Sequence, residues 1–361
     1  MKEPFSFLMA GGGTGGHVIP ALAVARELRR RGHLPFFVGT QHGIEARLVP
    51  ADGFPIEWIK VGGLNRVGPT QGLRTLWQIP GSVVRVLGVI EERRPGAVFS
   101  IGGYVAGPPM AAALLRRIPM VLMEPNAVAG MTNRWMGRFV RRALVNFEET
   151  VSQFPRGKTE VAGLPVREEF FAIPPKPRTR DLTLLITGGS RGSRRLNEAS
   201  RESWPLFRSS GLPVRILHQS GQEGHAALEQ GFAASGLDGE IVPFIHDMPA
   251  AFAQADLIVC RSGAGTVAEL TAAGKPAILV PFPFAADQHQ LRNAEALARA
   301  GAARLVLDQE FSGERLFHEV LAITSKAGLL ERMGMAARAL ARLGAAQRAA
   351  DLLEELAGSM R

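Results

Sequence analysis

A histidine that follows a dense cluster of glycines is the first feature of this sequence that could do chemistry. The stretch "LMAGGGTGGH" runs from an apolar segment through Gly11, Gly13 and Gly16 to His17. The glycines match the G-x-G-x-x-G pattern, which joins a strand to a helix and offers backbone N–H groups to a phosphate. A helix N-terminus disfavours a protonated imidazole, so a neutral His17 could accept a proton near pH 7. A structural hydrogen-bonding role for His17 and a catalytic role both remain open.

The glycine loop lacks the other residues of a dehydrogenase or a nucleotide hydrolase. A dinucleotide-binding domain needs an acidic residue at the end of its second strand, and here that strand ends "VGTQHG". The nearest acid, Glu45, comes late and falls in the next predicted helix. A Walker A motif would also need a lysine in the loop. The loop is therefore either a phosphate-sized hollow of N–H groups or a tight turn that binds nothing.

A second loop with suitable chemistry is "CRSGAGTVAELTAAGKP". Its backbone N–H groups, from Ser262 to Thr266, would meet a diphosphate at a helix N-terminus, with Arg261 as a nearby cation. Glu269 has two interpretations. Thr266-x-x-Glu269 matches a capping box, which stabilises a helix without a ligand. The same carboxylate could instead accept hydrogen bonds from two ribose hydroxyls.

A cluster of polar side chains follows in "PFPFAADQHQLRNAEA", after the fifth predicted strand of the second half. Open α/β sheets bind ligands at this carboxyl edge, and donors and acceptors of this kind suit the hydroxyls of a sugar. The alternative is a solvated helix start. The residues concerned are Asp287, Gln288, His289, Gln290 and Asn293.

Alternating strands and helices must position these loops. Strand-like segments include "LPFFVGT", "AVFSIGG" and "MVLME" in the first half, and "DLTLLIT", "VRILHQSG", "EIVPFI", "DLIVC", "AILVPF" and "AARLVL" in the second. Such alternation predicts parallel sheets with helices on both faces. We therefore expect an α/β fold of two Rossmann-like domains that face each other across a cleft, residues 1–160 and 164–340. The proline-rich and charged segment "AGLPVREEFFAIPPKPRTRD" reads as the linker.

The end of the chain has the spacing of one amphipathic helix, from about Ala336 to Ala357. This helix could pack back across either domain, and we assign its end, about 341–361, to the first. In the "GLRTLWQIPGSVVRVLGVI" stretch, by contrast, Pro80 and Gly81 are expected to break any single long helix.

Composition limits the partners and the compartment. The 361 residues carry a formal net charge of +9, which favours an anionic partner. Cys260 is the single cysteine, which excludes an intrachain disulfide and makes a reducing cytoplasm the default compartment. The uncharged run from Pro95 to Leu115 is long enough to span a bilayer, but its glycines and prolines predict a strand, a turn and a helix start instead.

Several motifs together resemble a known family. In order along nearly the whole chain they are "GGGTGGH", "IGGYVAGP", "EPNAVAGMTNR", "GLPVR", "TGGSRGSRRLN", "HQSG", "PFIHDM", "CRSGAGTVAE" and "DQHQLRNA". This ordered set is similar to the UDP-N-acetylglucosamine-dependent N-acetylglucosaminyltransferases of peptidoglycan synthesis, in glycosyltransferase family 28. The resemblance implies a GT-B fold and an inverting hexosyl transfer that converts lipid I to lipid II through a β-1,4 bond.

The resemblance also assigns the donor, UDP-N-acetylglucosamine, to the second domain. It implies that the Ile245 backbone recognises the uracil and that Phe244 lies over the uracil ring. It also implies that Arg167 and Ser190 bind the nucleotide. The diphosphate and ribose would lie along Ala264, Gly265, Thr266, Val267, Ala268 and Glu269. Gln290 and Asn126 would reach the donor sugar.

On the acceptor side, the resemblance implies that Thr14, Gly15 and Gly16 face the acceptor and the site of reaction, next to the donor. His17 is then the leading candidate for the base that takes the proton from the C4 hydroxyl, and Glu124 competes with it. Tyr104, with Gly102 and Gly103, would line the acceptor side. No Asp-x-Asp metal clamp is present, so we expect no cofactor and no catalytic metal, with N–H donors and Arg261 meeting the charge of the leaving UDP.

The implied lipid-linked acceptor requires contact with a membrane. Apolar residues rimmed by cations, as in Leu73, Arg74, Leu76, Trp77 and Arg85, are typical of an interfacial helix on anionic lipid, although they would also suit a core helix. We expect peripheral attachment at the cytoplasmic face of the inner membrane. The expected partners are UDP-N-acetylglucosamine, undecaprenyl-linked lipid I and the anionic membrane surface, with the cell-wall synthesis machinery as a further candidate.

Two other functions compete with this one. A transferase of the same fold could use a diacylglycerol or a small aglycone as its acceptor, although "GGYVAGP" and "EPNAVAGMTNR" favour lipid I. The basic charge would also suit a module that binds a UDP-sugar or a nucleic acid without catalysis. Dispersed arginines without an aromatic-rich sheet or a zinc motif argue against nucleic acid.

Overall fold

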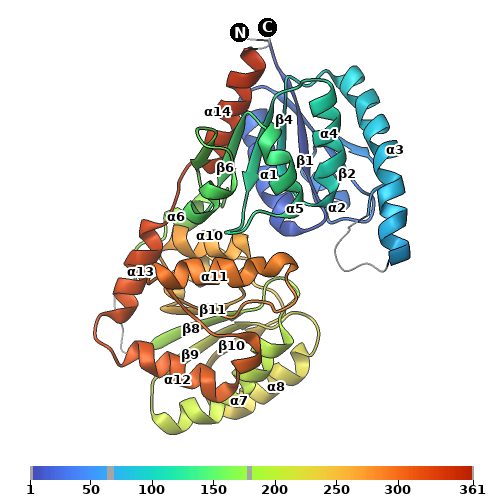
Figure 1. The fold of residues 1–361 in the computed structure, drawn as a ribbon. Coiled ribbons are helices and arrows are strands. Elements are labelled where there is room, and N and C mark those ends of the chain that lie inside the picture. Colours follow the sequence, from blue (N-terminus) through green and yellow to red (C-terminus); the bar gives the residue numbers. More distant parts are fainter. Residues whose placement is uncertain (1–2, 63–68, 177–180, 360–361) are drawn as a thin grey trace. The chain divides into compact units, whose positions relative to one another are not determined.

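The computed structural model describes residues 3–62, 69–176 and 181–359, with the side chains of 63–76 left out (Figure 1). The chain forms two compact units. Unit 1 comprises Met1–Pro165 and Arg342–Arg361, and unit 2 comprises Val166–Ala341. The last residues of the chain therefore belong to the same unit as the first.

Unit 1 is built on a seven-stranded parallel sheet in the order β3-β2-β1-β4-β5-β6-β7. Its strands are β1 (Ser6–Gly11), β2 (Leu34–Gly39), β3 (Ile56–Trp58), β4 (Ala97–Gly102), β5 (Met120–Glu124), β6 (Arg142–Val145) and β7 (Thr159–Val161). Its helices are α1 (Gly15–Arg30), α2 (Glu45–Ala51), α3 (Pro69–Arg93), α4 (Gly107–Leu115), α5 (Met131–Met136) and α14 (Ala345–Gly358), with short 3-10 turns η1 (Tyr104–Ala106), η2 (Gly137–Phe139) and η3 (Glu148–Gln153).

Unit 2 has a six-stranded parallel sheet in the order β10-β9-β8-β11-β12-β13. Its strands are β8 (Leu182–Thr187), β9 (Val214–Gln219), β10 (Asp238–Val242), β11 (Leu257–Cys260), β12 (Ala277–Leu279) and β13 (Ala303–Leu305). Its helices are α6 (Glu168–Phe171), α7 (Arg194–Ser210), α8 (His225–Ser235), α9 (Met248–Gln254), α10 (Ala264–Ala273), α11 (His289–Arg299), α12 (Gly313–Thr324) and α13 (Leu329–Ala339), with 3-10 turns η4 (Ala286–Gln288) and η5 (Asp308–Glu310).

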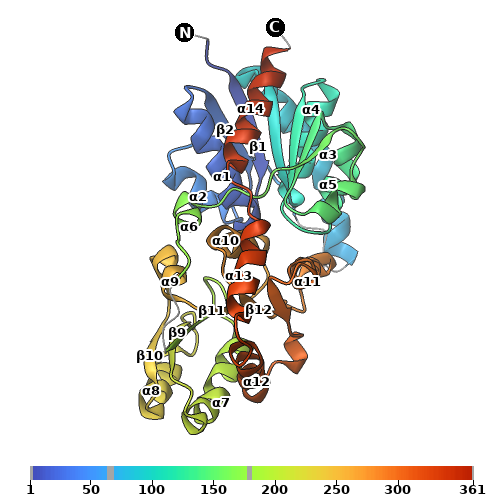
Figure 2. The same ribbon diagram turned by 90° about the vertical axis from the view of Figure 1, so that its left-hand side faces the viewer.

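The central strands are apolar along their whole length because helices cover both faces of each sheet. Every residue of β4 and of β8 is buried. In unit 1, α1 and α14 cover one face, and α3 and α4 pack together on the other (Figure 2). Both sheets have the Rossmann strand order, which reverses between β1 and β4 and between β8 and β11. Loops at these points lie at the carboxyl edge, where ligands bind in such folds.

The structure corrects three expectations from the sequence. First, β3, β6 and β7 were not predicted, because strands of three or four residues carry little periodic signal. Second, α3 continues through Pro80 and Gly81. A proline costs a helix about 3 kcal/mol, and the burial of Val86, Val89 and Ile90 in the core outweighs that cost.

The third correction concerns the end of the chain, where two helices replace the single one expected. The chain leaves α13 at Ala339 and enters α14 after Gly344, whose positive φ of 83° interrupts the helical path. The segment read as a linker contains α6, in which Phe170 is fully buried. The run from Pro95 to Leu115 forms β4, η1 and α4, as predicted. No helix in the described part of the chain is long and apolar enough to cross a bilayer.

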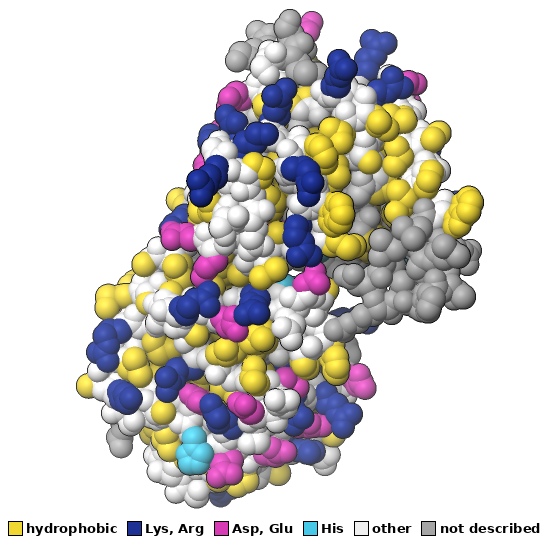
Figure 3. Space-filling model, in the orientation of Figure 1, with side chains coloured by type: hydrophobic (Ala, Val, Ile, Leu, Met, Phe, Trp, Pro, Cys, Tyr) yellow, Lys and Arg dark blue, Asp and Glu magenta, His cyan; other side chains and the backbone are white. Residues whose placement is uncertain are grey.

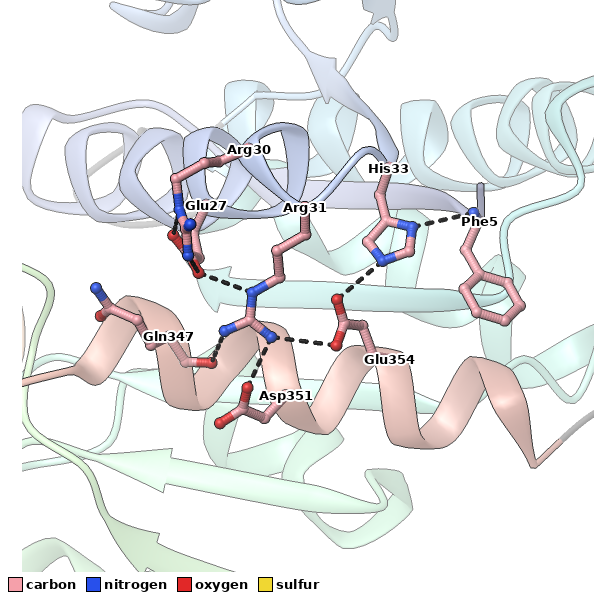
Figure 4. Close-up of polar contacts among 8 residues, drawn as sticks. All are labelled: Phe5, Glu27, Arg30, Arg31, His33, Gln347, Asp351 and Glu354. Atoms are coloured by element: carbon pink, nitrogen blue, oxygen red, sulfur yellow. Dashed lines mark hydrogen bonds and ion pairs between the residues drawn. The ribbon is translucent and has the colours of Figure 1, made fainter. Parts of the chain in front are cut away.

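A network of charged side chains attaches α14 to the end of α1 (Figure 4). Arg31 donates to Asp351 at 2.7 Å, to Glu354 at 3.1 Å and to Glu27 at 2.7 Å. Beside it, the Phe5 N–H donates to Nδ1 of His33, and Nε2 of His33 lies 2.9 Å from a Glu354 oxygen. Because Nδ1 accepts, Nε2 carries the proton and donates to Glu354.

Glu27 is the buried acid of this network. Hydrogen bonding from Arg30 outweighs the effect of burial and, together with Arg31, lowers the pKa of Glu27 to about 2. A folded-state pKa below the ordinary value of about 4.5 stabilises the fold above that value, and the stabilisation disappears as the pH falls toward 2.

We predict that Glu27→Gln lowers the free energy of unfolding at pH 7 by about 1 to 2 kcal/mol, because Arg30 is largely exposed and screening reduces its effect. Urea denaturation from pH 7 to pH 2 should show the wild-type advantage shrinking below about pH 4.5. Glu91→Gln, which removes an exposed ion pair with Arg116, is the matched control and should change stability by under about 0.5 kcal/mol. A constant difference across the pH range would contradict the prediction.

Candidate active site

His17 lies at the mouth of the first glycine loop. Thr14 caps α1 with extended backbone, and its Oγ1 lies 2.9 Å from Nδ1 of His17. The half-buried imidazole lies close to the backbone of Gly103, since a Cβ added there would be 3.5 Å from Nδ1. The loop after β1 and the loop after β4 therefore meet at His17, as the strand order requires.

The "GGY" segment forms the other wall. Gly102 and Gly103 have positive φ angles of 86° and 81°, which glycine adopts without strain. Thr132 Oγ1 donates to the Gly103 carbonyl, which holds this turn against α5. The ring of Tyr104 lies over Gly13, where an added Cβ would be 2.6 Å from Cε1 of the tyrosine. The structure thus brings Tyr104, Gly103 and His17 together, as the sequence predicted.

Glu124, the second candidate base, is an anchor for its own loop. It is buried at the end of β5, where one oxygen accepts from the N–H and the side-chain amide of Asn126 and the other from Gly130 N–H and the Asn133 amide. Burial raises the pKa of Glu124, and the four donors oppose this because they fit only the ionised form. With both oxygens accepting hydrogen bonds, Glu124 holds residues 126–133 in place.

In unit 2, the loop after β8 lines a cavity of about 680 Å³. Ser190 is exposed on its wall, beside Arg261 and Gln290, all three predicted from the sequence. The cavity also contains cations and aromatic rings that the sequence reasoning did not assign, although the "TGGSRGSRRLN" motif contains three of them. They are Arg191, Arg194, Arg195, Phe282 and Phe284.

Arg261 is held in place rather than free. Its Nη1 donates to Asp308 at 2.5 Å and to the Val280 carbonyl at 3.0 Å, and its Nη2 donates to Ser193 Oγ at 2.8 Å. Asp308 partly neutralises the guanidinium, so Arg261 offers less charge to an anion than the sequence suggested. Its fixed position also means that no side-chain entropy is lost if an anion binds beside it.

The first turn of α10 rules out the capping-box interpretation of Glu269. The helix begins at Ala264 with Gly263 as its N-cap, so Thr266 already lies inside the helix and caps nothing. Glu269 accepts no hydrogen bond from any residue that the structure describes. Burial raises the pKa of Glu269 to about 7, while the nearby charge of Arg167 lowers it. Ligand hydroxyls could donate to this half-buried carboxylate, which has no donor among the described residues.

The backbone of Ile245 is less available than expected. Its N–H donates to Oε1 of Gln219 at 2.8 Å, and the amide of Gln219 donates to the Gly189 carbonyl at 2.8 Å. Gln219, at the end of β9, is buried and was missed by the sequence reasoning, although the "HQSG" motif contains it. Uracil binding through the Ile245 N–H would require Gln219 to move. Phe244 is exposed beside it.

The predicted sugar-binding cluster divides into two parts. Asn293 is fully buried and donates to the Ser262 carbonyl, so it is structural. Gln290 accepts from the Phe282 N–H, while its side-chain N–H groups donate to no residue in the described part of the chain. Asp287 and Gln288 have positive φ angles of 47° and 51°, an unfavourable conformation for non-glycine residues that is typical of functional loops.

Two family models match the chain. The glycosyltransferase family 28 N-terminal domain matches residues 7–145, and the glycosyltransferase family 28 C-terminal domain matches residues 183–356. The chain belongs to glycosyltransferase family 28. Together the two models cover most of both units, which confirms the family resemblance read from the motifs.

Relatives in this family match over nearly the whole chain. The UDP-N-acetylglucosamine--N-acetylmuramyl-(pentapeptide) pyrophosphoryl-undecaprenol N-acetylglucosamine transferase of Solibacter usitatus is 65% identical over 98% of this chain and 96% of its own length. The enzyme of the same name from an Anaeromyxobacter species is 43% identical over 97% of this chain and 93% of its own. The crystal structure of MurG from Acinetobacter baumannii has a TM-score of 0.83 at 33% identity, over 98% of this chain and 100% of that one. The predicted GT-B fold class is confirmed.

The two candidate bases of this family 28 chain predict different mutant phenotypes. Glu124→Gln places an amide NH₂ against two N–H donors, and it should lower the free energy of unfolding by about 1 to 3 kcal/mol. His17→Ala removes one partly exposed hydrogen bond and should cost under about 1 kcal/mol. Urea denaturation of both variants measures the difference. Equal destabilisation, or a fully stable Glu124→Gln protein, would contradict the anchoring role of Glu124.

Proposed function

We propose that this chain moves N-acetylglucosamine from UDP-N-acetylglucosamine to the C4 hydroxyl of the N-acetylmuramoyl unit of lipid I, which gives lipid II for peptidoglycan synthesis. The observation that carries the proposal is 65% identity over 98% of the chain to a relative named for this transfer. The geometry of each unit supports this proposal. Unit 1 has His17 beside a glycine loop. Unit 2 has an arginine-lined cavity and, at Glu269, a carboxylate that could accept hydrogen bonds from ribose hydroxyls.

The donor would bind to unit 2 at the carboxyl edge of its sheet. Glu269 would accept two ribose hydroxyls, and the first-turn N–H groups of α10 would meet the diphosphate. Arg261 would add its charge from a position fixed by Asp308. The side-chain N–H groups of Gln290, which donate to no described residue, would donate to the sugar. Arg167, Ser190, Phe244 and Ile245 would hold the nucleotide.

His17 would act as the general base. If Nδ1–H donates to Thr14 Oγ1, Nε2 is unprotonated and can take the proton of the acceptor C4 hydroxyl. The C4 oxygen then attacks the anomeric carbon, the bond from that carbon to the UDP oxygen breaks, and the configuration inverts. The electron pair leaves with UDP, whose charge the N–H donors and Arg261 stabilise. We propose that this transfer needs no metal ion.

The test is transfer of labelled N-acetylglucosamine to a lipid I analogue by the wild type and by His17→Ala. We expect the variant to lose at least about a hundredfold in kcat, because a positioned base contributes about that much, while its affinity for UDP is unchanged. Full wild-type activity after exhaustive chelation is expected as well.

Three results would count against these assignments. A folded wild type that binds UDP but does not transfer to lipid I would point to another acceptor, such as a diacylglycerol or a small aglycone. An active His17→Ala protein would exclude His17 as the base. Loss of activity on chelation that added metal restores would exclude the metal-free mechanism.

Membrane attachment through unit 1 is the second part of the proposal. Figure 3 shows hydrophobic side chains gathered over α3 and α4, with arginines and lysines nearby. Exposed hydrophobic side chains lie on the neighbouring elements α3, α4, α5 and η2, and we call them the α3–α5 surface. They are Trp77, Val84, Leu114, Leu115, Met131, Trp135 and Phe139. Arg138 lies over the Trp135 ring, and Arg85 is largely exposed. Apolar side chains among cations suit an anionic lipid surface.

Of the predicted membrane residues, Trp77 is 80% exposed, while the side chains of Leu73, Arg74 and Leu76 lie outside those that the structure describes. The double variant Trp77→Ser, Leu115→Ser should bind vesicles containing anionic lipid at least about tenfold more weakly, since each large side chain contributes about 1.5 to 3 kcal/mol on burial. Vesicle sedimentation measures this, with UDP binding unchanged. Leu34→Ser, at an exposed leucine on β2, is the matched control. Unchanged vesicle binding by the double variant would argue against this surface.

A further inference from the structure

Glu45 is a buried carboxylate that the proposed mechanism does not use. It begins α2 and is fully buried. Its Oε2 accepts from the Gly13 N–H at 2.8 Å, and its Oε1 accepts from the N–H and the hydroxyl of Thr40 at 3.0 and 2.8 Å. One side chain therefore ties the glycine loop after β1 to the end of β2.

The backbone around Glu45 leaves space only for this side chain. A Cβ on Gly12 would lie 2.8 Å from Cδ of Glu45, a Cβ on Gly39 would lie 2.8 Å from Cγ, and a Cβ on Gly43 would lie 2.0 Å from Oε2. At Gly12 and Gly43 the carboxylate occupies the space that a Cβ would need, and at Gly39 the stem of Glu45 and Ile56 occupy it together. This close fit on three sides distinguishes Glu45 from an incidental buried acid.

We propose that Glu45 is a positioning residue for His17 and that its carboxylate occupies the place that a phosphate takes in nucleotide-binding glycine loops. This inference rests on the proposed function, because it assigns His17 the role of base. Gly13 lies between Glu45 on one side and the Tyr104 ring on the other. Its positive φ of 86° sets the direction of Thr14, whose hydroxyl lies against Nδ1 of His17.

The chain of contacts has a chemical consequence at each end. At His17, the orientation of Thr14 sets the rotation of the imidazole and which nitrogen carries the proton. At Gly13, the N–H is already engaged by an anion, and a second anion would meet a fixed negative charge. The Gly13 N–H is therefore already occupied, and we expect the loops of unit 2 to recognise the donor diphosphate.

The variants Glu45→Gln and Thr40→Val separate positioning from simple stability. In Glu45→Gln, the side-chain oxygen can still accept from Thr40, but its NH₂ then faces the Gly13 N–H, so the loop contact is lost. Thr40→Val removes one hydrogen bond to the same carboxylate and leaves Gly13 held. Both variants should lose stability, and only the first should disturb His17.

For Glu45→Gln we expect a loss of about ten- to a hundredfold in kcat toward the lipid I analogue, with the KM for UDP-N-acetylglucosamine within about twofold, because a small misplacement of a reacting group costs this much. Thr40→Val should keep kcat within about threefold. The ¹⁵N resonances of the His17 ring, assigned by their loss in His17→Ala, should report a changed tautomer in Glu45→Gln and an unchanged one in Thr40→Val. Equal effects of the two variants, or unchanged His17 resonances in Glu45→Gln, would overturn the positioning role.

A measurement on the wild type keeps the proposal testable if Glu45→Gln does not fold. Hydrogen exchange with and without inorganic pyrophosphate should show protection at residues 264–268, in the first turn of α10, and none at 10–16. Protection at 10–16 would overturn the assignment of the anion position to Glu45. This readout and the His17 resonances do not depend on catalysis, so a failure of the proposed transfer reaction would be seen separately.

Discussion

Buried carboxylates that accept N–H groups at the carboxyl ends of parallel strands hold this site together. A parallel sheet satisfies its own backbone, but each loop that leaves it exposes N–H groups that need acceptors. Glu45 supplies acceptors to the loop after β1, and Glu124 supplies them to the loop after β5. In unit 2, Asp308 does comparable work by holding Arg261, which in turn contacts the loop before α7 through Ser193.

This arrangement separates the residues that hold the site from those that can react. Glu45 and Glu124 are buried, with their oxygens occupied, whereas His17 is half-buried and the side-chain N–H groups of Gln290 donate to no described residue. Glu269 is the exception, a half-buried acid that accepts no hydrogen bond from the described residues, and desolvation raises its pKa. An acid without hydrogen-bond donors raises the free energy of the protein when no ligand is bound. Ligand hydroxyls that donate to it would offset this cost.

The C-terminal segment shows how contacts distant in the sequence complete a unit. Unit 1 includes α14, which Arg31 and His33 attach to the end of α1 through Asp351 and Glu354 (Figure 4). A second ion pair, from Arg348 to Glu160, joins α14 to β7. The amphipathic pattern of α14 predicted a helix with one buried face, which either domain could cover. Apolar packing against α1, β4 and β5, together with these charged partners, about three hundred residues away for Arg31 and Asp351, places α14 on unit 1.

The sequence by itself determined the two parallel sheets, the position of the glycine loops after their first strands, and membership of family 28. These features follow from hydrophobic periodicity and from motifs that are contiguous in the chain. Roles that depend on a partner elsewhere in the chain were decided only by the tertiary structure. In the folded chain Glu124 holds its own loop by hydrogen bonds, and the Ile245 N–H donates to Gln219. Arg261 pairs with Asp308, and Thr266 lies inside α10, where it cannot act as the N-cap. The physical reason is that a side chain's donors and acceptors are assigned by what folding brings within about 3 Å of them, which local sequence does not encode.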